Sequence, residues 1–257
     1  MKALHALVIA IALIGCASLR GAEEKALAAD PAPDAGFVAE PENLERQSDG
    51  MPFDRMWLSP ERDWAHYPKL YVAVVDVHHV LEMSWWDKVN IRKSKVEYDL
   101  MVVADELRED LIEAFRDDPQ HHFEIVDDPA QVDADTAQLE VALVELVPNK
   151  AILGALGLAA WGAPLEIGIP VATATAFIAH GAVAMEARVR DGRSGEVIAT
   201  FADRETGKMR VIDLRSLTWY GNASEDFQGW ANGFVGLANT DRPEQVRHST
   251  YFTISPW

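Results

Sequence analysis

The chain has 257 residues and is strongly acidic, with 41 Asp and Glu against 23 Lys and Arg, so its formal net charge is −18 at pH 7. Binding to nucleic acid, or to anionic membranes through a polybasic surface, depends on Lys and Arg neutralising phosphates, and this charge balance disfavours both. A single cysteine in the whole chain excludes the class of small exported domains that are stabilised by disulfides.

The first fifteen residues, MKALHALVIAIALIG, place Lys2 before an apolar run, which is the layout of an export signal. The run is too short to span a bilayer, which needs about 20 apolar residues. Leu13-Ile14-Gly15-Cys16 resembles the bacterial lipobox. That resemblance implies cleavage before Cys16, a thioether-linked diacylglycerol on its sulfur and an N-acyl chain such as palmitate. A thiolate is a nucleophile suited to this modification; the alternative is an ordinary signal peptide with an incidental cysteine.

The residues after Cys16 predict where the protein lies and where its domain begins. Ala17 stands where an aspartate would resemble the inner-membrane retention signal, so we expect a periplasm-facing lipid anchor in the outer membrane of a Gram-negative envelope. The periplasmic face of the inner membrane is the alternative. Residues 17–50 carry few large apolar side chains and cannot offset their ordering entropy. We therefore predict a lipidated cysteine with a flexible tether over residues 16–50, and a single periplasmic domain over residues 51–257.

The first half of that domain contains two clear periodic patterns. Residues 51–68 predict aromatic packing across a domain face without regular structure, and residues 69–80, KLYVAVVDVHHV, predict a central strand. Residues 81–95 predict a loop. From residue 96 to residue 115 apolar side chains recur every three or four positions, which predicts an amphipathic helix that ends before Pro119.

The second half predicts more strands and a second helix. Residues 123–128 and 137–147 are strands, and residues 181–208 form a hairpin that turns at residues 191–195. Asn222 or Ser224 is expected to cap a final helix with an apolar stripe. The order strand, helix, strand, strand, insert, hairpin, helix predicts an α/β (α+β) domain with a single mixed sheet and two main helices packed on it.

The insert, residues 151–180, is almost entirely apolar and permits two interpretations. It is either a buried connection that covers the sheet or a loop that contacts a bilayer or a partner through its small residues. No uncharged run in it reaches 18 residues, which argues against a membrane span. The candidate contact residues for a membrane or a partner are Trp85, Trp86, Trp161, Ile167 and Phe177.

Residue patterns that signal catalysis or metal binding are weak in this chain. His78-His79 and His121-His122 are adjacent pairs, and neighbours on a strand point to opposite faces. The chain has no HExxH, CxxC, G-x-S-x-G or glycine-rich phosphate loop. Asp117-Asp118 and Asp127-Asp128 flank predicted element ends, where acids are common turn residues. We therefore predict no catalytic residue, metal or cofactor, and a protein that is not an enzyme.

Four stretches carry a resemblance to a known family. They are MPFDRMWLSPERDWAHYPKLYVAVVDV (51–77), DTAQLEVALVELVP (135–148), AMEARVRDGRSGEVIATFADRETGK (184–208) and DFQGWANGFVGLAN (226–239). Together they resemble the proteobacterial family of predicted lipoproteins called domain of unknown function 3313, over roughly residues 50–240. The family has no established activity, so no site residue is carried over. The element order is also similar to the periplasmic domains of the curli secretion lipoprotein, of penicillin-binding-protein activator lipoproteins and of the Tol-system propeller protein.

These patterns predict a lipid-anchored envelope protein that acts as a non-enzymatic protein-interaction or assembly module. It would contact the bilayer through acylated Cys16 and bind an envelope protein, but no nucleic acid. The tether and the exposed-looking aromatics Trp57, Trp85 and Trp86 favour this function. The alternative is a small-ligand or lipid-binding lipoprotein that uses residues 151–180 as a pocket wall.

Overall fold

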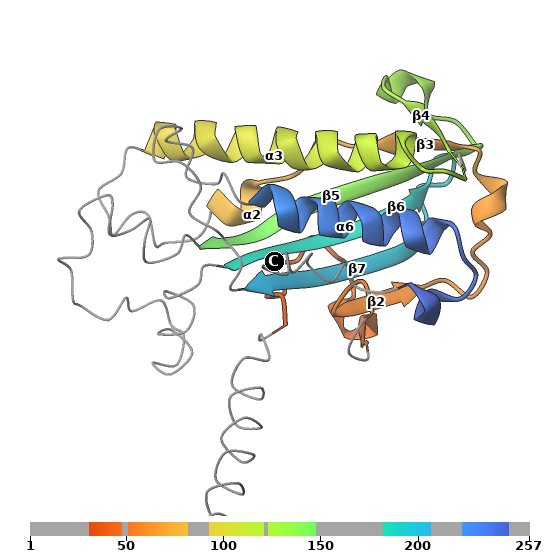
Figure 1. Ribbon diagram of the computed structural model, residues 1–257, viewed down its shortest axis with the longest axis horizontal. Coiled ribbons are helices and arrows are strands. Elements are labelled where there is room, and N and C mark those ends of the chain that lie inside the picture. Colours follow the sequence, from red (N-terminus) through yellow and green to blue (C-terminus); the bar gives the residue numbers. More distant parts are fainter. Residues whose placement is uncertain are drawn as a thin grey trace, which may run out of the picture. The chain divides into compact units, whose positions relative to one another are not determined.

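A mixed sheet with the spatial order β1-β2-β7-β6-β5-β3-β4 forms the centre of the protein (Figure 1). The computed structural model describes residues 31–47, 51–81, 93–120, 123–147, 182–206 and 223–246. The seven strands within these ranges are β1 (Glu45–Arg46), β2 (Arg55–Leu58), β3 (Lys69–Val72), β4 (Glu124–Val126), β5 (Thr136–Val147), β6 (Ala182–Asp191) and β7 (Val197–Thr206). β3 pairs in parallel with β4 and β5, and the other neighbours are antiparallel.

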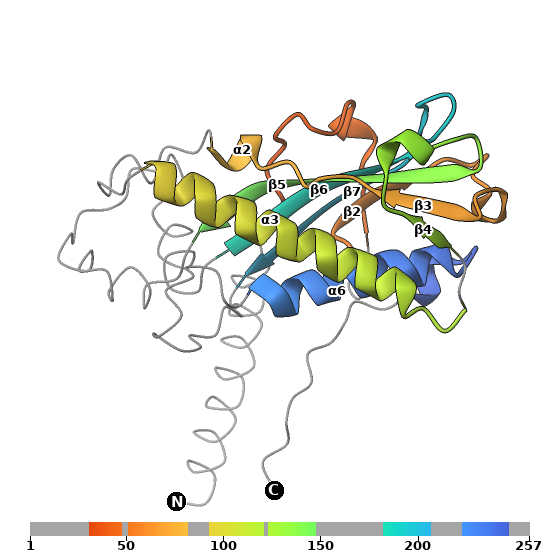
Figure 2. The ribbon, with the colours of Figure 1, turned by 90° about the horizontal axis from the view of Figure 1, so that it is seen from above.

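Two helices, α3 (Lys93–Arg116) and α6 (Ala223–Ala238), cover one face of the sheet (Figures 1 and 2). The predicted fold class, a single mixed sheet with two main helices packed on it, is confirmed. A one-turn helix, α2 (His78–Leu81), follows β3. The described connections contain the 3₁₀ turns η1 (Pro41–Asn43), η2 (Trp64–His66), η4 (Pro129–Gln131) and η6 (Pro243–Gln245).

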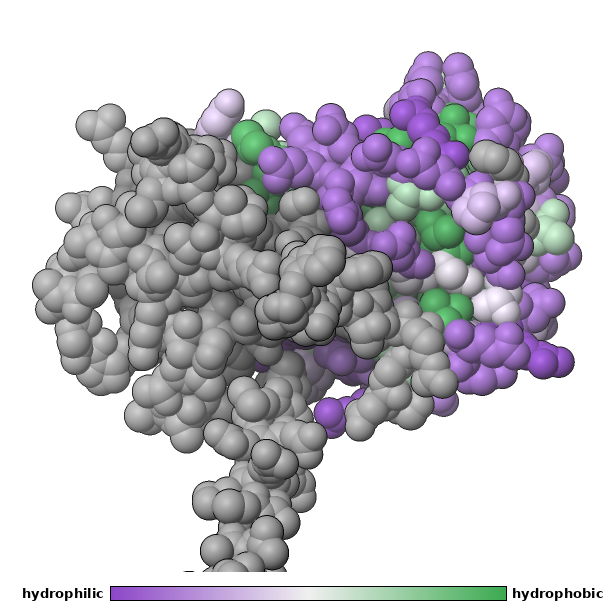
Figure 3. Space-filling view, viewed as in Figure 1, coloured by the Kyte–Doolittle hydropathy of each residue, from purple (hydrophilic) through white to green (hydrophobic). Residues whose placement is uncertain are grey.

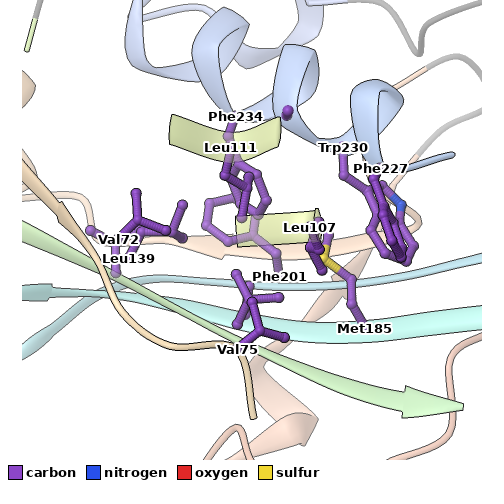
Figure 4. Packing of buried hydrophobic residues seen from close by; sticks show 14 of the residues in the cluster. Val72, Val75, Leu107, Leu111, Leu139, Met185, Phe201, Phe227, Trp230 and Phe234 are labelled. Atoms are coloured by element: carbon purple, nitrogen blue, oxygen red, sulfur yellow. The ribbon is translucent and has the colours of Figure 1, made fainter. Parts of the chain in front are cut away.

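The main hydrophobic core fills the space between these helices and the sheet (Figure 4). Alternate residues of the central strands, such as Met185 and Phe201, point toward α6, whose Trp230 and Phe234 point back at them. The ring of Phe234 lies 4.6 Å from that of Phe53 and 5.1 Å from that of Phe201, between centroids. Full burial of a large apolar side chain contributes about 1.5–3 kcal/mol, so this layer supplies much of the stability.

The β6–β7 hairpin turns at residues 191–195, as its Asp-Gly and Ser-Gly steps predict. The Asp191 carboxylate accepts hydrogen bonds from the backbone N–H groups of Arg193 (3.1 Å) and Ser194 (2.6 Å). Gly195 has φ +71°, a conformation that favours glycine. A Cβ at Gly192 would lie 2.3 Å from the carbonyl oxygen of Asp133, so only glycine lets the turn pack against this loop.

The predicted strand over residues 69–80 is too long. β3 ends at Val72, Asp76 makes an isolated bridge to Ala142, and α2 begins at His78. The Asp76 carboxylate accepts a hydrogen bond of 2.6 Å from the backbone N–H of His78, which starts the helical turn. The expectation of no regular structure over residues 51–68 is also wrong, because β2 pairs with β7 within it.

The predicted flexible tether over residues 16–50 is wrong for residues 31–47: residues 31–44 pack on the sheet face opposite α3 and α6 (Figure 2), and Glu45–Arg46 form β1 in the sheet. Ala32, Val38 and Leu44 are buried there against alanines of β5, β6 and β7. We call residues 31–44 the N-terminal strap. Its few apolar side chains are supplemented by hydrogen bonds to a buried carboxylate, which composition alone does not reveal.

Candidate functional site

Charged side chains of β5, β6 and β7 lie on the outer face of the sheet, the face opposite α3 and α6. The strand register arranges them in rows that cross the sheet. One row comprises Trp57, Thr200, Arg188 and Glu140, and the next comprises Arg55, Ala202, Glu186 and Ala142. The N-terminal strap lies over the second row, so the sheet register determines which charges it covers.

Glu186 is the residue that fastens the strap to the sheet. It is fully buried, and its carboxylate accepts hydrogen bonds from the backbone N–H groups of Ala35 (3.1 Å), Phe37 (3.0 Å) and Val38 (3.0 Å). The small side chains of Ala142 and Ala202 flank it and let the strap backbone approach closely. A buried carboxylate is costly unless it is hydrogen-bonded, and these three donors satisfy that requirement.

Two arginines hold the strap at its sides. Nη1 of Arg188 donates a hydrogen bond of 2.7 Å to the carbonyl of Phe37, and its guanidinium carbon lies 4.3 Å from the centroid of the Phe37 ring. Nη2 of Arg55 donates to the carbonyl of Ala32 and to the carboxylate of Asp34, both at 2.9 Å. The strap is therefore bound through its backbone, through the Asp34 ion pair and through one cation–π contact.

A buried ion pair lies further along the same face. Nε and Nη2 of Arg204, on β7, donate to the carboxylate of Glu145, on β5, at 2.6 and 2.9 Å. The two side chains reach across Ala184 of β6 and are 5% and 7% exposed. This two-point geometry is the strong form of an Arg–carboxylate contact, and it links the two strands that flank β6.

A pocket of about 190 Å³ opens between the strap and the first row, and we call it the strap pocket. Its lining residues are Ala39, Glu40, Asn43, Trp57, Arg188, Arg190, Val197 and Thr200. Nε of Arg188 and Nε of Arg190 both donate to the same oxygen of Glu140. Two guanidinium groups thus share one carboxylate at the pocket wall.

On the helix side of the sheet, Asp203 is the prominent buried acid. Its carboxylate accepts hydrogen bonds from the indole Nε1–H of Trp230 (2.6 Å) and from the backbone N–H of Asp54 (2.8 Å). Burial, with the nearby charges of Asp54 and Glu205, raises the pKa of Asp203 to about 8. Asp203 joins β7, α6 and the residues before β2, so its geometry is that of a structural group.

The site residues predicted from the sequence lie outside the described residues. These are Cys16, Trp85, Trp86, Trp161, Ile167 and Phe177, together with the insert 151–180 and His121-His122. Within the described ranges, Trp57 is half-buried in the wall of the strap pocket. Those ranges also contain no helix long and apolar enough to cross a membrane.

The other candidate polar residues have structural surroundings. His78 and His79 lie on α2, and the expectation that they lie on a strand is wrong. Among the residues that the structure describes, no group of three or more His, Cys, Asp or Glu could hold a metal ion. Asp118 accepts hydrogen bonds from the Gln120 N–H and the Asn239 side chain, both at 3.0 Å.

Sequence reasoning missed the charged cluster of the outer face. Glu186, Arg188 and Arg190 alternate with apolar residues, and such a pattern predicts a solvated strand face. Ala142, Ala184 and Ala202 are the signal that could have corrected this, because small residues on a strand face allow a second segment to approach. Only the strand register shows that these alanines neighbour the charges.

Three comparisons with known proteins give one family and a set of distant structural neighbours. The family model described as "Protein of unknown function (DUF3313)" matches residues 33–234. A search of curated proteins finds no match. Among solved structures, the PelC dodecamer from Paraburkholderia phytofirmans is 11% identical, with a TM-score of 0.35, covering 68% of this chain and 93% of that chain. A leucine-to-methionine variant of that dodecamer is 10% identical, with a TM-score of 0.35, covering 70% and 96%. A TM-score of 0.35 is too low to support an inference about this chain.

Proposed function

We propose a function for a chain that belongs to the DUF3313 family, the proteins of unknown function whose family model its residues 33–234 match. The family resemblance predicted from the sequence is confirmed, and the match begins in the N-terminal strap. The proposed role is that of a lipid-anchored envelope protein that binds other proteins in the periplasm and is not an enzyme. Its anchor would lie in the inner leaflet of the outer membrane.

The observation that carries this proposal is the Leu13-Ile14-Gly15-Cys16 motif at the end of a short apolar run. Acylation of Cys16 would give the chain more than one lipid chain, which is the requirement for stable anchoring. The folded part begins by Pro31, and fifteen residues of polypeptide span at most about 50 Å. An anchored domain of this kind would meet its partners close to the membrane.

Two features of the folded part favour protein binding over catalysis. Three buried carboxylates have hydrogen-bond partners: that of Glu145 binds an arginine, that of Glu186 binds backbone N–H groups, and that of Asp203 binds an indole N–H. Their hydrogen-bonding capacity is therefore used to join elements. The described surface on the helix side is mostly hydrophilic with small apolar patches (Figure 3), which is compatible with a reversible interface, because such an interface is about as apolar as the rest of a protein surface.

Photocrosslinking in intact cells tests the proposal. Met101, 60% exposed on α3, is replaced by a photoreactive amino acid in the chain expressed at its normal level, and Glu113 on the same helix is the matched control position. We expect a discrete crosslink to one envelope protein from Met101 and none from Glu113, and the crosslink should be lost in a Cys16→Ala background. A smear of abundant proteins at both positions, or a crosslink to cytoplasmic proteins, would contradict the proposal.

A further inference from the structure

Arg188 and Arg190 of the strap pocket each have a hydrogen-bond donor, Nη2, that the described structure leaves available. The Nε of each arginine donates a hydrogen bond to Glu140. Nη1 of Arg188 donates to the carbonyl of Phe37, and Nη1 of Arg190 donates to the carbonyl of Gly195, both at 2.7 Å. In the described part of the chain no hydrogen bond is made by either Nη2 group, and neither is among the buried unpartnered atoms. Both Nη2 groups are thus accessible donors at the pocket wall.

The local charge supports one additional anion. Arg188 and Arg190 bring two positive charges and Glu140 one negative charge, and the three side chains are only 22–28% exposed. One positive charge is therefore left over in a half-buried place on a chain of net charge −18. Glu40, at the exposed rim of the pocket, binds the side-chain amide of Asn43 at 2.6 Å. With Glu40 counted, the four side chains are neutral, so the excess of one positive charge is confined to the half-buried arginine end of the pocket, where a monoanion matches it and a dianion exceeds it.

The remaining walls determine the shape of what binds. Trp57 presents an aromatic side chain and Val197 an aliphatic one on the same pocket. A volume of about 190 Å³ is room for several waters or for a small ring bearing one polar group. Arg forks bind carboxylates at two points and also stack on aromatic rings.

We propose that the strap pocket binds a compact monocarboxylate with a flat apolar body. The carboxylate accepts hydrogen bonds from the Nη2 groups of Arg188 and Arg190, and the flat body packs against Trp57 and Val197. The ligand is a free small molecule or the carboxylate end of a peptide, which share this chemistry. The site goes beyond the proposed protein-binding function and does not depend on Cys16.

The strap itself forms one wall of this site. Ala39, Glu40 and Asn43 belong to it, so the pocket exists only while the strap is bound to the sheet. Glu40 has φ +66°, a left-handed conformation that is rare outside glycine and that occurs at ligand sites. Since a ligand stabilises the state that binds it, occupancy of the pocket will protect the strap from opening.

The test uses the purified full-length chain and benzoate, with benzamide as its neutral analogue and phenyl phosphate as a dianion of similar size. Binding is followed by the NMR shift of the Trp57 indole and by hydrogen exchange of the strap amides. We expect benzoate to bind with a Kd on the order of 1 mM. Benzamide and phenyl phosphate should each bind about ten-fold more weakly or worse. Equal binding of benzoate and benzamide, or no binding of benzoate, would overturn the proposal.

Two matched variants each remove one positive charge. Arg190→Gln removes it inside the pocket, and Arg193→Gln removes it at the exposed tip of the neighbouring turn. The hydrogen bonds of Arg190 in the described structure go to Glu140 and to the carbonyl of Gly195 and not to the strap, so its variant should keep the strap in place, as exchange of the unliganded protein will verify. Arg190→Gln should weaken benzoate about ten-fold, whereas Arg193→Gln should leave it unchanged. An equal response of the two variants would refute the site.

A final comparison identifies the source of the carboxylate. A dipeptide that ends in phenylalanine is titrated beside its C-terminal amide. Tighter binding of the free acid than of benzoate supports the site with a peptide end as ligand, and weaker binding supports it with a small molecule. Equal binding of the acid and the amide, like equal binding of benzoate and benzamide, counts against a carboxylate site.

Discussion

Asp203 shows how single buried polar residues organise this fold. Its two carboxylate oxygens accept one hydrogen bond each, from Trp230 on α6 and from the backbone at Asp54. Removing one partner of a buried pair leaves the other unsatisfied, which costs about 1–3 kcal/mol. The alternation of β7 predicts an inward-facing position for residue 203, but it does not predict that a carboxylate there would find an indole N–H.

The Trp230→Phe substitution tests this contact. It keeps an aromatic ring in the core and removes the N–H that donates a hydrogen bond to Asp203. We therefore expect the free energy of unfolding, measured by urea denaturation, to fall by about 1–3 kcal/mol. In an Asp203→Ala background the same substitution should cost much less, because its partner is absent. Equal costs in the two backgrounds would show that the hydrogen bond contributes nothing.

The raised pKa values predict how stability depends on pH. The pKa of Asp203 is raised to about 8, and burial with neighbouring acids raises that of Asp110 to about 6. Between pH 4 and pH 8 the folded state therefore binds more protons than the unfolded state, so stability should fall as the pH rises through this window. Denaturation at pH 5, 6, 7 and 8 measures the slope. Asp203→Asn should flatten it, whereas stability that rises with pH would contradict the assignment.

At the scale of elements, regular periodicity is what the sequence reveals reliably. The helix predicted over residues 96–115 and the β6–β7 hairpin are present, because their apolar stripes are long and regular. The strand predicted over residues 69–80 is longer than β3, because the apolar run continues past the point where the Asp76 side chain starts a helical turn. The strap was missed because its order depends on Glu186, about 150 residues away in the chain.

The Glu186→Gln substitution should release the strap without unfolding the sheet. A glutamine amide turns one acceptor into a donor that faces the strap N–H groups, so hydrogen exchange at Ala35, Phe37 and Val38 should accelerate at least about ten-fold, equivalent to about 1.4 kcal/mol. Glu124→Gln, on the exposed edge strand β4, is the control and should leave these rates unchanged. Unchanged strap exchange in Glu186→Gln would mean that apolar packing alone holds the strap.

At the scale of the whole molecule, the sequence and the structure inform on different parts of the function. The residues that predict an anchor and membrane or partner contacts lie outside the described residues. The strap pocket, in contrast, could not be predicted from the sequence. It is formed by residues of the strap, β2, β6 and β7, which only the register of the sheet and the course of residues 31–44 bring together.

Mass spectrometry of the mature protein, extracted with detergent from its native envelope, tests lipid anchoring most directly. We expect a chain that begins at Cys16 and carries the added mass of a diacylglycerol and one further acyl chain on that residue. A Cys16→Ala variant should carry no lipid mass while its domain melts at the same temperature. A native chain that begins at another residue, or one whose Cys16 has a free thiol, would contradict the account.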